Sequence, residues 1–222
     1  MTLDEFDIEF DIMYNNISSD QAPGLTKYEK SVFLTQAQEA LVLDLYKGIT
    51  GDSFETTEEV TRYLSSLVKS EDNKKLQTDE IIANGIARYY TSLPDDAMFI
   101  TYQSATYEGN DIIVTPSRQE FLHKDLRNPF RGPSKNRILY ISEGNNLYYY
   151  IGKGTDYNKY NICIKYLKIP SPIIIDPTDG YTINGYPKDA STEETFNCEL
   201  PESLHRNILI RAVQLAKAVW QS

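Results

Sequence analysis

The 222-residue chain has few of the residues from which catalytic and metal centres are usually built. It contains two cysteines, two histidines, one tryptophan and three methionines. Cys163 and Cys198 lie 35 positions apart, which is neither a metal-ligand spacing nor a redox spacing. Two histidines supply few imidazoles for an ordinary zinc centre. These shortages predict a protein with no catalytic residues, no cofactor and no metal.

Long apolar runs are also missing. None approaches the roughly 20 residues that a membrane-spanning helix needs, so we expect no membrane association. Residues 1–6 are acidic and lack the basic region that opens a secretory signal. We therefore expect a cytosolic protein whose thiols stay reduced.

Basic residues are the minority, and they are unevenly placed. The net charge is −10, with −13 over residues 1–117, +6 over 118–168 and −3 over 169–222. An acidic chain is not a typical nucleic-acid-binding protein. Opposite charges on different segments favour head-to-tail contacts between copies. The alternative is a solvated acidic surface that only keeps the protein soluble.

Helical signals occupy the first third of the chain. Two S/T-x-x-E capping boxes precede apolar residues at helical spacing, and they predict helices over about residues 2–17 and 26–48. A third helix is expected from about residue 56 to 68. Residues 69–75 are rich in charge, which indicates a solvated linker.

The middle of the chain, from about residue 81 to 175, is predicted to be β structure. Eleven of the 17 tyrosines lie between residues 89 and 166, and tyrosine fits a half-buried pleated surface. Residues 143–146 carry a hairpin signal. Strands are expected at residues 87–93, 98–102, 111–115, 137–142, 147–151 and 160–169.

A last helix is predicted to follow Pro201, because proline favours the first helical position. Its second apolar stripe includes Leu209, Val213 and Trp220. A helix that is apolar on two stripes needs two partners. One is expected to be the N-terminal helices, and the other a neighbouring subunit.

These elements predict an α+β fold class. We expect a helical bundle of the N-terminal helices and the C-terminal helix, interrupted by a mainly antiparallel β insertion. The predicted parts are residues 1–80 (N-terminal helical part), 81–175 (β-rich insertion) and 176–222 (loop and C-terminal helix completing the bundle).

Several motifs with a chemical appearance are better read as turns. Residues 152–155 resemble a phosphate loop only faintly, and a hairpin turn is the stronger interpretation. Residues 176–180 lack the spacing of a calcium loop, so a proline turn is expected. An enzyme would need His123 close to Asp125 or Cys163, or a nucleophile pair of His123 with Cys198.

Residues 118–133 form the most specific segment. A short helical start is followed by Asn-Pro and Gly-Pro breaks around an aromatic residue and an arginine. Such a rigid loop would present Arg127, Phe130 and Arg131 as an interface at low entropic cost. The alternative is a structural corner in which Phe130 fills the core.

Four segments together resemble a known family: residues 28–38, 92–94, 125–133 and 199–209. The Asn-Pro-Phe-Arg and Leu-Pro-x-x-Leu-His pieces are the more specific ones. The chain resembles head-to-tail connector, or portal-adaptor, ring proteins of tailed bacteriophages, and in particular those of crAss-like phages.

The resemblance implies a structural virion protein without catalytic residues. It implies a homo-oligomeric ring of about twelve copies at the head–tail junction, assembled in the host bacterial cytoplasm. The implied partners are the portal protein, adjacent tail or connector proteins, and genomic DNA in transient, non-specific passage. A tyrosine-rich binding module of a phage tail or cell-surface protein is the alternative.

Overall fold

The computed structural model describes most of the chain, and that part divides into two compact units. Unit 1 is Met1–Leu67 with Ile169–Ser222, and unit 2 is Val68–Lys168. Within the described residues, no helix is long and apolar enough to cross a membrane. The described residues are 1–17, 24–49, 54–82, 86–152, 156–176, 181–186 and 197–220.

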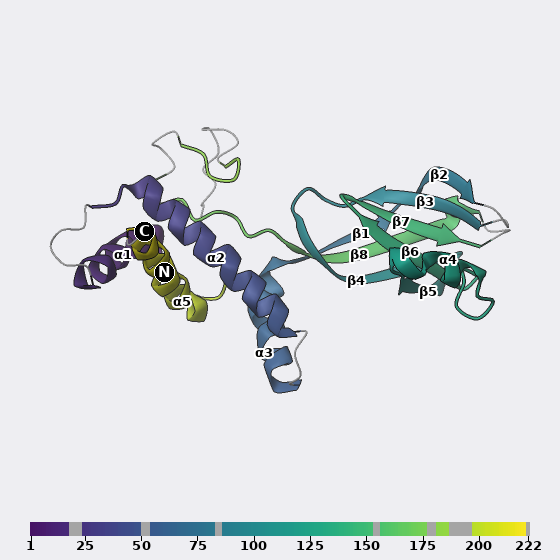
Figure 1. Cartoon of the computed structure of the whole chain (residues 1–222), viewed down its shortest axis with the longest axis horizontal. Helices are drawn as coiled ribbons and strands as arrows, with labels where there is room; N and C mark the ends of the chain where they lie inside the picture. The colour runs from purple at the N-terminus through teal and green to yellow at the C-terminus, as the bar shows by residue number, and fades with distance from the viewer. Residues whose placement is uncertain are drawn as a thin grey trace. The chain divides into compact units, whose positions relative to one another are not determined.

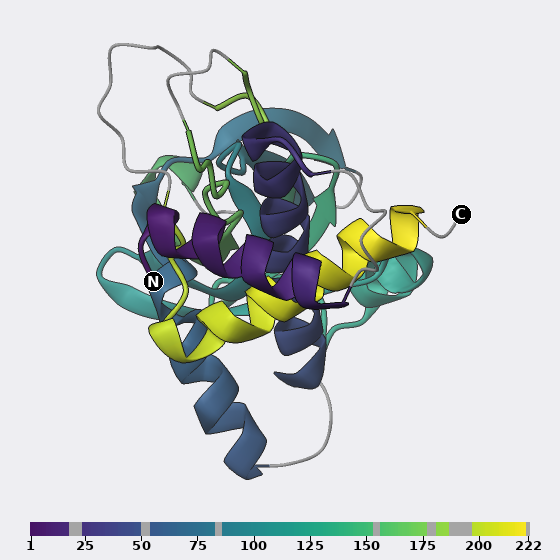
Figure 2. The ribbon, with the colours of Figure 1, turned by 90° about the vertical axis from the view of Figure 1, so that its left-hand side faces the viewer.

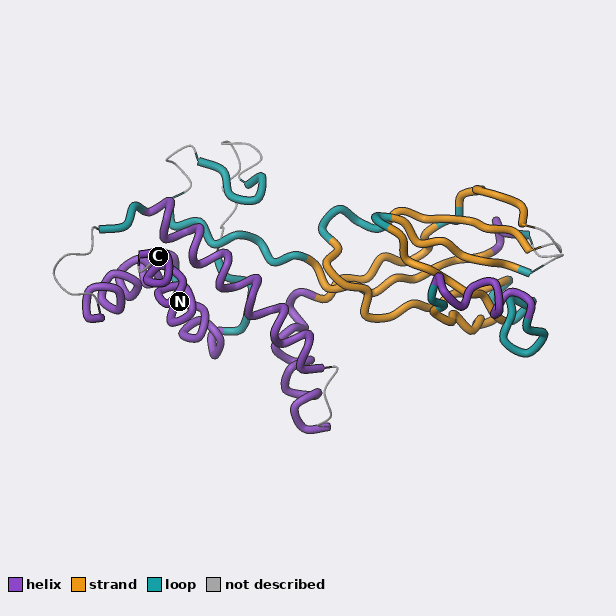
Figure 3. The backbone as a smooth tube through the Cα atoms, in the orientation of Figure 1, coloured by secondary structure: helices purple, strands orange, loops and turns teal. Residues whose placement is uncertain are grey.

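Unit 2 is a single curled, mixed sheet of eight strands (Figures 1 and 3). The strand order is β1-β8-β4-β5-β6-β7-β3-β2. Neighbouring strands pair antiparallel, except that β5 and β6 run parallel. The bounds are β1 Val68–Lys74, β2 Gln77–Ile82, β3 Ile86–Ser92, β4 Ala97–Tyr107, β5 Asn110–Pro116, β6 Arg137–Glu143, β7 Asn146–Ile151 and β8 Tyr160–Lys168.

This sheet overturns the predicted fold class. The fold is mainly a mixed sheet with helices towards the ends of the chain, and it is not a helical bundle interrupted by an antiparallel insertion. Part of the error lies at residues 69–75, predicted as a linker, of which residues 69–74 belong to edge strand β1. Val68 pairs with Leu167 and Lys74 with Ile162. Edge strands carry charged side chains readily, so charge alone did not reveal the strand.

The sheet curls around one main core. Consecutive side chains of a strand point to opposite faces, and one face of β4, β5, β6, β7 and β8 supplies most of this core. Because strands from both halves of the sheet contribute, the two halves share one apolar cluster. Its buried members are Leu76, Ala105, Tyr107, Ile112, Ile138, Leu147, Tyr149, Ile151, Tyr160, Ile162 and Ile164.

The tight hairpins follow the sequence signals. The hairpin predicted at residues 143–146 is confirmed, with β6 ending at Glu143 and β7 beginning at Asn146. Gly144 has a φ of 57°, in the left-handed region that glycine adopts without steric cost. The six predicted strands all coincide with strands of the sheet.

Unit 1 contains four helices in its described part: α1 (Leu3–Ile17), α2 (Lys27–Ile49), α3 (Phe54–Leu64) and α5 (Glu202–Trp220). Both capping boxes are formed, since the amides of Thr2 and Thr26 each donate to a glutamate 2.8 Å away. Figure 2 shows α1 and α5 lying side by side across α2, and α5 contacts both helices. The predicted helices over 2–17 and 26–48, and the one after Pro201, are therefore confirmed.

A buried lysine joins α1 to α2. The Lys30 ammonium lies 2.6 Å from Asp7 and 2.7 Å from Asp11, and its side chain is 6% exposed. Burial alone would lower the pKa of Lys30, but hydrogen bonds and attraction from the two carboxylates outweigh it and raise that pKa. The lysine therefore stays charged and paired, and it orients α1 on α2.

Residues 171–176 run along α2 in an extended conformation and bond to its polar side chains. Ser31, Thr35 and Gln38 are buried and recur at helical spacing. The Thr35 hydroxyl accepts from the Ile173 amide at 3.1 Å, Ser31 accepts from the Ile175 amide at 3.0 Å, and Gln38 donates to the Ser171 carbonyl at 2.8 Å. These side chains satisfy backbone groups that would otherwise be buried unpaired.

We predict that Thr35→Val lowers the free energy of unfolding of unit 1 by about 1–3 kcal/mol, because the buried Ile173 amide loses its acceptor. Thr35→Ser keeps the hydroxyl and is the matched control, for which we expect a smaller loss. Chemical denaturation followed by helical circular dichroism measures both. Equal stability of Thr35→Val and wild type would contradict this role of the hydroxyl.

His205 is the buried histidine of unit 1. Its Nε2 lies 2.9 Å from the Leu200 carbonyl and its Nδ1 lies 2.8 Å from the Met1 ammonium, so a neutral ring donates to the first and accepts from the second. Burial lowers the pKa of His205 from its ordinary 6.5. The unfolded chain therefore takes up a proton near pH 6.5 that the folded chain does not.

We predict that stability falls as the pH drops below about 6.5, by at most about 1.4 kcal/mol per pH unit from this group. His205→Gln should remove that dependence between pH 7.5 and 5.5. His123→Gln, at an exposed histidine on α4, is the control for replacing a histidine by glutamine elsewhere in the chain. Thermal unfolding across this pH range tests the prediction, and an identical profile for His205→Gln and wild type would refute it.

Candidate functional site

The most prominent exposed feature of unit 2 is the loop that follows helix α4 (Gln119–Arg127). Phe130 in this loop is 86% exposed, the highest value among the exposed large apolar side chains described. The predicted alternative, in which Phe130 fills the core, does not match this exposure. Its role in an interface stays a prediction.

Helix α4 is held against the sheet face opposite the main core. Leu122 and Leu126 pack against a cluster of Leu139, Ile141 and Tyr150. At the N-terminal side of the helix, the Ser117 hydroxyl donates to the Asp125 carboxylate at 3.0 Å. Leu139, Ile141 and Tyr150 lie on β6 and β7 next to residues that face the main core. Because neighbouring side chains of a strand point to opposite faces, these three lie on the other face of the sheet, under α4.

Asn128 fixes the turn that carries Phe130. Its side-chain oxygen accepts from the amides of Phe130 at 2.9 Å and Arg131 at 3.3 Å. The Gly132 amide donates to the Asn128 carbonyl at 2.7 Å, and Arg137 Nη1 donates to the Phe130 carbonyl at 2.5 Å. The Phe130 side chain is therefore exposed on an ordered backbone, which reduces the entropy lost on contact.

Gly132 is required at its position by space. A Cβ atom there would lie 2.7 Å from the Asn128 carbonyl oxygen and 3.1 Å from that of Asp125. Any other residue would push the turn away from the end of α4. The Asn-Pro-Phe-Arg-Gly-Pro sequence thus specifies a turn with little freedom.

Positive charge surrounds Phe130. Residues 118–137 contain six bases and two acids. Arg127 and Arg131 from the predicted interface are exposed, as are two lysines that the sequence analysis did not single out, Lys124 and Lys135. The excess of bases over acids in residues 118–168 was the sequence signal that could have pointed to these lysines.

The predicted interface residues of the last helix lie in a different environment. Leu209 is 0% exposed and Val213 is 2% exposed, both within unit 1. Trp220 is the last residue of α5, and its side chain lies outside the described atoms. A charged residue at Leu209 would therefore damage the folded chain itself, and the interface role of this stripe stays a prediction.

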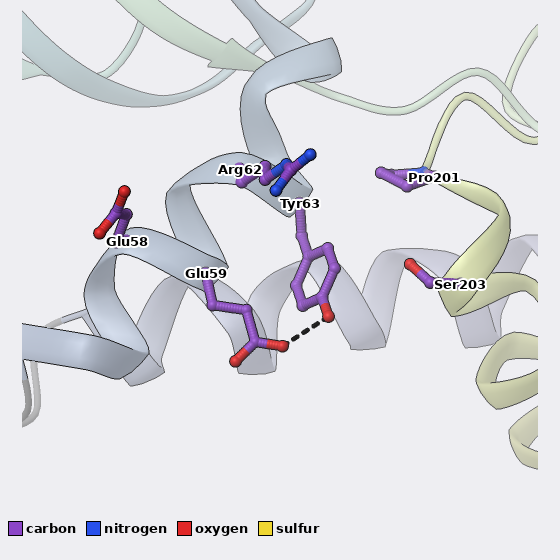
Figure 4. A pocket seen from close by; sticks show the side chains of 6 residues that line it. All are labelled: Glu58, Glu59, Arg62, Tyr63, Pro201 and Ser203. Carbon is purple, nitrogen blue, oxygen red and sulfur yellow. Dashed lines mark hydrogen bonds between the residues drawn. The ribbon is translucent and has the colours of Figure 1, made fainter.

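Unit 1 contains an open hollow of about 520 Å³ between α3 and the start of α5 (Figure 4). The Tyr63 hydroxyl donates to Glu59 at 2.6 Å, and this bond raises the pKa of Tyr63. No imidazole or thiol is among the lining residues. The lining residues are Glu58, Glu59, Arg62, Tyr63, Pro201 and Ser203.

The residues weighed for catalysis are dispersed. His123 is exposed on α4, whereas Cys163 on β8 donates to Asp72 Oδ1 at 2.8 Å on β1. Burial raises the pKa of Cys198 to about 11, which disfavours a reactive thiolate. Among the described residues, no group of three or more His, Cys, Asp or Glu side chains could hold a metal ion. Most of the residues read as loop turns, 153–155 and 177–180, lie outside the described residues.

Comparison with known proteins assigns the chain to a family. A family model described as phage tail ring protein 3/4 matches residues 1–222. Ring protein 3 of Bacteroides phage crAss001 is 40% identical over 97% of this chain and 95% of its own length. Ring protein 4/5 of the same phage is 32% identical over 100% of this chain and 94% of its own length. The chain belongs to the crAss-like phage ring protein 3/4 family.

We predict that Asn128→Ala loosens the loop without unfolding the sheet. Loss of the acceptor for two amides should speed hydrogen exchange at residues 130–131 by about tenfold, the equivalent of one net hydrogen bond. Phe130→Ala is the control, because it keeps the acceptor and should leave those exchange rates unchanged. Unaltered exchange in Asn128→Ala would show that Asn128 does not order the turn.

Proposed function

We propose that this protein forms a ring in the head–tail connector below the portal, where it extends the DNA channel and docks tail components. The observation that carries the proposal is the match along its whole length with two relatives named as ring proteins of one phage. A ring of about twelve copies would be closed by one heterologous contact repeated around the axis. The protein would act as a structural component and not as an enzyme.

The exposed surface of unit 2 supports an assembly role. The ordered loop around Phe130 offers an apolar centre with a charged rim, which is the usual composition of a specific interface. Several tyrosines, by contrast, are part of the apolar core of the sheet. Tyr149 and Tyr160 are fully buried, and Tyr107 packs on Tyr160 at 4.7 Å between ring centroids. A sugar-binding tyrosine surface is therefore not the function favoured here.

The overall charge supports a passage for DNA instead of a binding site for it. The chain carries −10, and an acidic lining would repel phosphates and let the genome slide. A basic lining would instead release counterions and hold the duplex. We expect no retention of duplex DNA by the purified protein at about 50 mM salt, where phosphate contacts are strongest.

The test locates the protein in purified particles of the virus that encodes it. We expect mass spectrometry to find the chain in particles, and gold-labelled antibodies to mark the junction between head and tail. Negative-stain images of the assembled protein should show rings with an axial hole. Its absence from purified particles, or labelling confined to tail fibres, would refute the proposal.

A further inference from the structure

The outer face of helix α1 is acidic and apolar at once. The helix contains five acids and no base. Ile8 is 60% exposed and Ile12 is 54% exposed, although the opposite face of the same helix buries Phe6 and Phe10 completely. We call the exposed face the α1 ridge: Asp4, Glu5, Ile8, Glu9 and Ile12.

The ridge follows from helix geometry. Residues three, four and seven positions apart lie on one side of a helix, so Glu5, Ile8 and Ile12 form a line. Asp7 and Asp11 lie towards α2 and are engaged by Lys30, at 2.6 and 2.7 Å. The acids of the ridge are a separate set, and its two isoleucines are not needed to pack α1 into unit 1.

The loop after α4 has the complementary composition. Phe130 is 86% exposed on an ordered turn, and the exposed charged side chains of residues 124–135 are all basic. We call this surface the Phe130 patch: Lys124, Arg127, Phe130, Arg131 and Lys135. Each surface thus has an apolar centre and a rim of one charge, and the two charges are opposite.

Resting on the proposed ring function, we propose that the α1 ridge of one copy binds the Phe130 patch of the next copy. Phe130 would pack against Ile8 and Ile12, while the arginines at 127 and 131 face the exposed acids Asp4 and Glu9. Burial of the three apolar side chains provides the attraction, and the charges set register and orientation.

Charge also favours a head-to-tail contact between unlike surfaces over a two-fold contact between identical surfaces. Two α1 ridges placed together would set three acids against three, and two Phe130 patches would set bases against bases. Like-charge contacts of this kind are costly, so a two-fold dimer through either surface is disfavoured. A contact between unlike surfaces is heterologous, and heterologous contacts generate rings when their rotation closes.

Charge reversal tests the contact. In one variant Asp4 and Glu9 become lysine (Asp4→Lys, Glu9→Lys), which leaves the capping-box Glu5 intact, and in a second Arg127 and Arg131 become glutamate (Arg127→Glu, Arg131→Glu). Each variant alone should lose self-association by tenfold or more in Kd, because identical charges now meet in every contact. Sedimentation velocity over a concentration series measures this, and circular dichroism confirms that each variant is folded.

Mixing the two charge-reversed variants is the decisive experiment. Equal amounts of the two variants should associate as wild type does, since unlike charges then face each other in an alternating arrangement of both chains. One chain carrying all four substitutions should also recover. Rescue by mixing requires that the contact joins different copies, because a contact within one chain would not be restored by a second variant.

Apolar substitutions provide a second readout. Phe130→Ala and Ile8→Ser should each weaken association, and Tyr102→Ala is the matched control, as Tyr102 is 57% exposed on β4 outside both surfaces. Association of either charge-reversed variant like wild type, or a wild-type chain that stays monomeric at every concentration, overturns the inference. Antibody labelling of particles would still test the ring function separately in both cases.

Discussion

The structure depends on a stripe of buried polar side chains along α2. Ser31, Thr35 and Gln38 bond to the backbone of residues 171–175, and this segment has no strand partner of its own. A helix face that was entirely apolar would leave those amides and carbonyls unpaired and buried, at a cost of about 1–3 kcal/mol each. The stripe therefore fixes the path of residues 171–175 along α2.

The chain between residues 68 and 168 forms a sheet that is complete in itself. Its first and last strands, β1 and β8, are adjacent and antiparallel, so residues 68 and 167 lie opposite each other. Insertions whose ends are close in space are tolerated by a host fold. The loop after α4 can then carry an exposed aromatic side chain, because the stability of the sheet comes from a core to which Phe130 contributes nothing.

Local signals in the sequence predicted what is determined locally. The capping boxes, the hairpin at Gly144 and the alternation of residues 160–166 all correspond to observed elements. The predicted fold class was wrong where pairing is long-range. Strand β1 is charged and is identified only by its pairing with β8, from Val68–Leu167, 99 positions apart, to Lys74–Ile162, 88 positions apart, and the parallel β5–β6 pair has no local signature. The last predicted β residues, 171–175, are extended on a helix, since β-branched side chains favour extended backbone without specifying its partner.

The candidate site shows the same division. Asn-Pro and Gly-Pro predicted a rigid loop, and the asparagine side chain supplies that rigidity by accepting from two amides. Whether Phe130 faced inward or outward depended on the tertiary position of α4, which no residue spacing encodes. The exposure of Ile8 and Ile12 could not be predicted from the sequence either, because a helix with apolar residues on two sides can be buried on both. What sequence alone did carry is the sign of the charge on each segment. Opposite signs on α1 and on the loop after α4 are the charge pattern that the proposed contact between copies needs, because surfaces of like charge disfavour a two-fold arrangement and surfaces of unlike charge favour a heterologous one.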